Sequence, residues 1–137
     1  MYLTVRDPRR DRLLQRFAEL CIASSPADQA MRLREALELA RANRSAEIIE
    51  VMIAAGAYES AALAVIGTEA TWMASRGGAG RCLASIVLPG MTEDVSAEGT
   101  TPALALLAAW AKAALVNVSR QGADLALAER PAGTLLH

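Results

Sequence analysis

The sequence is poor in the side chains that carry most catalytic and metal-binding chemistry. Its single histidine, His137, is the last residue, and its two cysteines, Cys21 and Cys82, fall in different predicted elements. A histidine-based triad and a zinc site with regular Cys and His spacing are therefore not expected. Two isolated cysteines without a signal peptide predict reduced thiols and a cytoplasmic location. We predict a chain without enzymatic activity, metal or cofactor.

Aromatic residues and an excess of either charge are also scarce. Aromatic residues make up only 4% of the chain, which predicts a core of small and aliphatic side chains rather than a deep aromatic pocket. The net charge is −1, so nothing attracts the whole molecule to nucleic acid or to an anionic membrane. The run closest to a membrane span, residues 103–118, is interrupted by Lys112. It therefore predicts a buried helix and no membrane association.

Helical periodicity fills the N-terminal part of the chain. Asp7-Pro8 combines a capping oxygen with a proline suited to the first helical position, and it predicts a helix over residues 8–23. Further helices are expected over 27–42 and over 46–55, where Gly56 ends the pattern. The last of these is dense in apolar residues, so we expect it to be buried on most sides or to lie at an interface.

The middle of the chain changes from helical to strand-like patterning. After a short apolar helix over 58–66, strands are expected over 71–75 and 81–88, joined by a glycine-rich turn, with a short third strand near Val95. Thr101-Pro102 then opens an Ala/Leu helix that runs to Val118. We predict an α+β fold, rich in helix, with a small antiparallel sheet of two to three strands. The predicted parts are an N-terminal helical extension (1–56), an α-β-β-α core (57–118), and a short helix with a flexible tail (119–137).

Arginines supply the candidates for contact with anions or nucleic acid. Arg9, Arg12 and Arg16 share one face of the first predicted helix and could meet phosphates, although neighbouring aspartates dilute the charge and a solvated face is favoured. Arg76 and Arg81 flank the glycine-rich turn and could bind an anion.

The glycine-rich turn and the one acidic cluster are interpreted as structural. Gly77-Gly78-Ala79-Gly80 lacks the lysine and the following helix of a phosphate-binding loop, so a hairpin turn is favoured. Glu93, Asp94 and Glu98 lack the spacing of a calcium loop, which favours a solvated loop.

The candidates for protein recognition are a few large apolar side chains. Tryptophan is enriched at binding hot spots, which makes Trp72 and Trp110 candidates, although burial in the core is favoured for each. The dense apolar helix over 46–55 adds Ile49 and Met52. These four residues form the predicted interface with a protein partner or with a second copy in a homodimer.

Several strings in the middle of the chain resemble one family. They are Tyr58-Glu59-Ser60-Ala61-Ala62-Leu63, Thr71-Trp72, Ser85-Ile86-Val87-Leu88 and Thr100-Thr101-Pro102-Ala103-Leu104-Ala105-Leu106. They are similar to the phage ABA-sandwich type of small protein, over residues 57–116. This hairpin has one tryptophan and lacks the usual proline before its first strand. The resemblance implies an α-β-β-α fold from a phage or prophage, with no activity or site to carry over.

These observations predict a non-catalytic protein that acts by binding another protein, such as an accessory or host-modulating factor of a prophage. The alternative is a regulator that binds nucleic acid through Arg9, Arg12 and Arg16. A small-molecule sensor ranks last, because few aromatic or polar residues are available to line a pocket.

Overall fold

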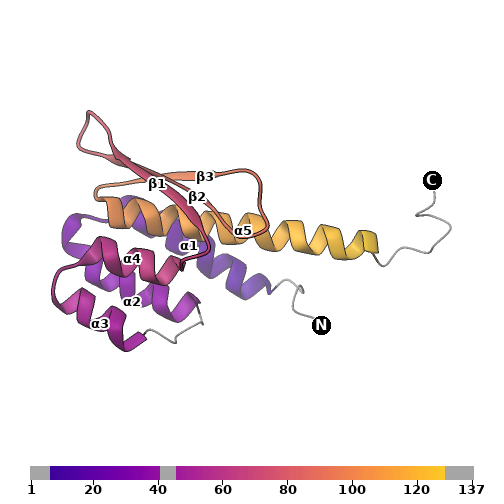
Figure 1. The fold of residues 1–137 in the computed structure, drawn as a ribbon, viewed down its shortest axis with the longest axis horizontal. Helices are drawn as coiled ribbons and strands as arrows, with labels where there is room; N and C mark the ends of the chain where they lie inside the picture. The colour runs from indigo at the N-terminus through magenta and orange to yellow at the C-terminus, as the bar shows by residue number, and fades with distance from the viewer. Residues whose placement is uncertain (1–6, 41–45, 129–137) are drawn as a thin grey trace.

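The computed structural model describes residues 7–40 and 46–128, with side chains through Asn117. Its elements are α1 (Pro8–Ala23), a 3-10 turn η1 (Pro26–Asp28), α2 (Gln29–Ala40), α3 (Ala46–Ala54), α4 (Tyr58–Ile66), β1 (Thr71–Arg76), β2 (Cys82–Val87), β3 (Val95–Gly99) and α5 (Pro102–Ala128). The helix-rich α+β class predicted from the sequence is confirmed, and so is a third strand near Val95 (Figure 1).

The sheet is antiparallel and has the order β1-β2-β3, so β2 is central and the other two strands are edges. On β2 the side chains of Cys82, Ala84 and Ile86 are buried, while those between them are half-buried or exposed. This alternation places one face of the sheet against helices. The helices within residues 7–40 and 46–128 all lie on that side, and none of them covers the opposite face, which we call the open face (Figure 1).

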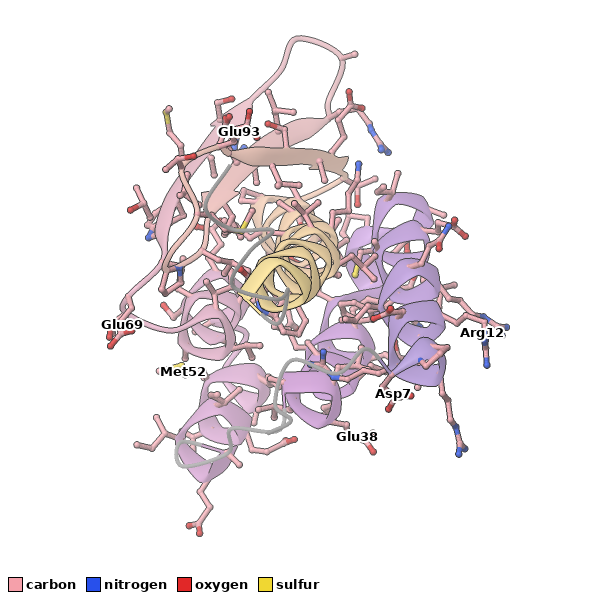
Figure 2. The ribbon with its side chains drawn as sticks, turned by 90° about the vertical axis from the view of Figure 1, so that its right-hand side faces the viewer. Asp7, Arg12, Glu38, Met52, Glu69 and Glu93 are labelled. Carbon is pink, nitrogen blue, oxygen red and sulfur yellow. The ribbon has the colours of Figure 1, made fainter. Side chains whose placement is uncertain are left out.

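Helix α5 is the centre of the fold. It runs beneath the sheet, with α1 and α4 on its two sides and α2 and α3 further from the sheet (Figure 2). Every residue from Ala103 to Ala109 is almost fully buried, which explains an Ala/Leu sequence without a polar face. Gly99 of β3 allows the sheet to approach this helix, because an added Cβ would lie 2.7 Å from the Ala105 amide nitrogen.

The N-terminal helices share this core. Phe17 of α1 packs against Trp110 of α5, and Leu14 and Cys21 are also completely buried. At the other end of α1, Thr100 donates a hydrogen bond to the Ser24 carbonyl, 2.9 Å away. Helix α1 therefore forms part of the helical layer beside α5.

Two element boundaries within the described residues differ from the predicted ones by more than one residue. Helix α5 continues through Gly122 to Ala128 instead of ending near Val118. A single glycine costs a helix only about 1 kcal/mol relative to alanine, and its neighbours are good helix formers. Helix α2 begins at Gln29, because Pro26–Asp28 form a 3-10 turn in which Asp28 caps the Ser25 amide. The predicted tail and His137 lie outside the described residues.

Candidate interaction surfaces

The open face of the sheet is not covered by any of the described helices (Figure 1). The strand register aligns Met73, Ser85 and Ser96 across it, and Ser75, Leu83 and Glu98 form the next row. Met73 is 68% exposed and Leu83 is 45% exposed. The Ser85 and Ser96 hydroxyls are hydrogen-bonded to each other at 2.8 Å. The apolar side chains of such a surface can bury apolar area against a partner protein, and the hydroxyl groups can orient that partner through hydrogen bonds.

Trp72 lies next to this surface, on edge strand β1. Its register partner is buried Ile86, so its ring is on the helix-facing side of the sheet. It is nevertheless 47% exposed, because the helices cover β2 and β3 more fully than β1. Of the four predicted interface residues, Trp72 is therefore the one with most surface to offer.

The other predicted interface residues are distributed between core and surface. Ile49 is 3% exposed and Trp110 is 7% exposed, so both belong to the core and present almost no surface to a partner. Met52 is half-buried. Helix α3 turns Ile49 and Ile53 inward and leaves Ile48 and Val51 exposed. The density of apolar residues indicated such a face, but the sequence pattern did not single out these two positions.

The arginines predicted to meet anions do not form one patch. Arg9, Arg12 and Arg16 are exposed on α1, and Arg12 points away from the body of the molecule (Figure 2). Arg81 lies near the other end of this helix, where it donates to the Ile22 carbonyl at 3.3 Å. Arg9 and Ile22 are about 20 Å apart along the axis of α1, because they are thirteen residues apart in the helix. A ligand of small size would therefore not meet Arg9 and Arg81 together.

Arg76 reaches a polar hollow near the first turns of α4 and α5. The hollow has a volume of about 420 Å³, and its lining includes Gln29, Tyr58, Glu59 and Thr101. Thr101 accepts a hydrogen bond from the Leu104 amide and donates one to Gln29. The amide ends of two helices and a guanidinium favour an anion here, and Glu59 opposes it. The hollow is thus a mixed polar surface.

The glycine-rich segment forms the β1–β2 hairpin turn predicted from the sequence. The Gly77 amide donates to the Arg81 carbonyl at 2.7 Å, and Gly80 has a φ of +74°. The positive φ accounts for a glycine at this position.

The acidic residues are exposed and only partly paired. Glu93 and Asp94 lie in the β2–β3 connection, whereas Glu98 is on β3, 3.6 Å from the Arg81 guanidinium. Within residues 7–40 and 46–128, no group of three His, Cys, Asp or Glu side chains is placed to hold a metal ion.

Both cysteines are free and buried. Burial raises the pKa of the Cys21 thiol to about 12, although the nearby Arg32 guanidinium acts in the opposite direction. A thiol with such a pKa stays protonated at neutral pH and is a poor nucleophile.

No family model, curated protein or solved structure matches this chain. None of the described helices is long and apolar enough to cross a membrane.

Proposed function

We propose that this chain is a non-catalytic protein-binding module whose partner covers the open face of the sheet. The observation that supports this most directly is the exposure of Met73 and Leu83 on a face that none of the described helices covers. Protein interfaces combine an apolar centre with a polar rim, and here Ser75 and Glu98 flank Leu83 across the strands while Ser85 lies beside Met73. The resemblance of residues 57–116 to phage ABA-sandwich proteins, taken from the sequence strings alone, adds an accessory or host-modulating role to this proposal.

The test combines affinity capture from a lysate of the source cells, with nuclease, and a variant of the open face. Leu83→Glu introduces a charge at the centre of that face, and Thr92→Glu introduces the same charge in an exposed loop. We expect a stoichiometric protein partner to be captured by the natural chain and by Thr92→Glu, and to be lost with Leu83→Glu. Circular dichroism shows whether both variants remain folded. Equal capture by the folded variants would reject the open face as the binding surface.

The second candidate function is nucleic-acid binding through Arg9, Arg12 and Arg16, which are all exposed on α1. This function predicts binding that weakens steeply with salt. It also predicts that replacing the three arginines with alanine abolishes retention of a labelled duplex, while Leu83→Glu leaves retention unchanged. Retention that is insensitive to salt and to these arginines would reject it.

A further inference from the structure

Edge strand β1 has backbone hydrogen-bonding groups that no other described residue pairs with. In an antiparallel ladder, every second residue of a strand directs its N–H and C=O groups to the neighbouring strand. The Gly77 amide donates to the carbonyl of Arg81, its cross-strand partner, so the odd-numbered residues of β1 face β2. It follows that Trp72, Ala74 and Arg76 direct their backbone groups to the open edge.

The opposite edge of the sheet is protected. Lys112 of α5 donates from Nζ to the Ser96 carbonyl of β3, at 3.4 Å. Glu98 adds a negative charge to the same strand, and Glu93 and Asp94 precede it. Charged side chains at an edge disfavour pairing with another strand. Two β3 strands brought together would also place these carboxylates close to one another.

Strand β1 has no comparable protection. Its sequence, Thr71-Trp72-Met73-Ala74-Ser75-Arg76, contains no proline and only one charge, at its end. Trp72 and Met73 are exposed on its two faces. Arg76 is exposed and makes no hydrogen bond or ion pair with the described part of the chain. Such an edge is a template for strand addition.

We propose that the occupant of this edge is β1 of a second copy, paired antiparallel about a two-fold axis at Ala74. An axis perpendicular to the sheet keeps both helical layers on one side and pairs residues whose numbers sum to 148. Trp72 then lies opposite the partner's Arg76, and Arg76 opposite the partner's Trp72. Both side chains are on the helix-facing side, where a guanidinium can stack on an indole ring.

Several features of strand β1 favour this pairing. The small Ala74 side chain is at the axis, where the two strands are symmetric. The two Arg76 charges lie near opposite ends of the paired strands, so they do not repel each other directly. The result is one continuous six-stranded sheet with a closed two-fold interface. Pairing at this edge does not depend on a partner that binds the open face.

The first test is the molar mass of the full chain by sedimentation over a range of concentrations, up to about 0.5 mM. We expect a reversible monomer–dimer equilibrium. Ala74→Pro removes an amide that faces the open edge, and we expect it to raise the dissociation constant by about tenfold or more. Ser96→Pro is the matched control on β3, where the Lys112 contact places the Ser96 backbone at the outer edge. We expect it to leave dimerisation unchanged.

Three outcomes would overturn the proposal. They are a monomer throughout the concentration range, assemblies that grow beyond the dimer, and a dimer that persists in folded Ala74→Pro. The first of these would leave the protein-binding function intact, because that function is tested by Leu83→Glu.

Cross-linking provides a second test of the pairing that does not require Ala74→Pro to fold. Ala74→Cys places two thiols across the proposed axis, within the range of Cα separations that a disulfide spans. Cys21 and Cys82 are buried and do not compete. Mild oxidation should convert most of Ala74→Cys into a covalent dimer and leave Leu83→Cys, on the neighbouring strand, monomeric. Equal cross-linking of the two variants would contradict the register.

Discussion

Phe17 of α1 and Trp110 of α5 meet edge to face, with their ring centroids 6.4 Å apart and their planes at 84°. They are the only aromatic pair in contact among the described residues, and both rings are buried. The contact joins the N-terminal helix to the central helix, although the two residues are ninety-three positions apart in the chain. An aromatic edge that meets an aromatic face is favoured electrostatically, in addition to the area that it buries.

The first prediction concerns this pair. Trp110→Ala should lower the free energy of unfolding by about 3–5 kcal/mol, because it removes a large buried ring and leaves a cavity. Phe17→Leu keeps much of the volume but loses the aromatic contact, and we expect a loss of about 1–1.5 kcal/mol. Urea denaturation followed by circular dichroism measures both. A loss for Trp110→Ala no larger than for exposed Trp72→Ala would contradict this packing.

The second prediction concerns the contact between sheet and helix at Gly99. A Cβ at this position would lie 2.7 Å from the Ala105 amide nitrogen and 3.0 Å from the Leu104 carbonyl carbon. These are backbone atoms of a buried helix, so they cannot move aside as a flexible side chain would. Gly99→Ala should therefore destabilise the fold by about 1–3 kcal/mol.

Gly78→Ala is the matched control for Gly99→Ala. No atom lies within 4 Å of the added Cβ, and Gly78 does not have a positive φ. Thermal unfolding should show a clear loss for Gly99→Ala and almost none for Gly78→Ala. Similar melting temperatures for the two variants would mean that β3 does not approach α5 so closely.

The elements were predictable where local chemistry determines them. The Asp7 side chain accepts a hydrogen bond from the Arg9 amide, and Pro8 begins α1, as the sequence indicates. The alternation along β2 predicted its buried face, because successive side chains of a strand point to opposite sides. The predicted end of the last helix, before Gly122, was wrong, because a glycine ends a helix only where the backbone leaves the helical conformation.

The surfaces were less predictable than the elements, because exposure depends on neighbours that are distant in sequence. Trp110 is buried because Phe17 and the sheet surround α5, whereas Trp72 is exposed because β1 is an edge strand. Both are tryptophans in apolar surroundings, and no local pattern separates them. The same holds for α3, in which Ile48 is exposed and Ile49 is buried according to the position of α4.

The third prediction concerns the start of α5. Thr101 Oγ1 accepts from the Leu104 amide at 3.2 Å and donates to the Gln29 side chain at 2.8 Å. Thr101→Ala removes both hydrogen bonds and should cost about 1–2 kcal/mol of stability. Thr101→Ser keeps the hydroxyl, so it should retain most of that stability in the same urea titration. Equal losses for the two substitutions would show that the methyl group, and not the cap, is responsible.

The fourth prediction concerns Cys21 and follows from its buried thiol. The thiol loses its proton at about pH 12 in the folded chain, compared with an ordinary pKa of 9.0 in the unfolded chain. The protonated form is thus favoured by folding, and the stabilisation is fully present below pH 9 and decreases as the pH rises toward 12. Urea unfolding at pH 8 and at pH 10.5 should show lower stability at the higher pH. Cys21→Ala should reduce this difference, because between these two pH values the Cys21 thiol titrates mainly in the unfolded chain. In the same pH range, a thiol-specific reagent should modify Cys21 only after urea is added. Rapid modification of Cys21 in the folded natural chain, or an unchanged pH dependence in Cys21→Ala, would contradict the burial of this thiol.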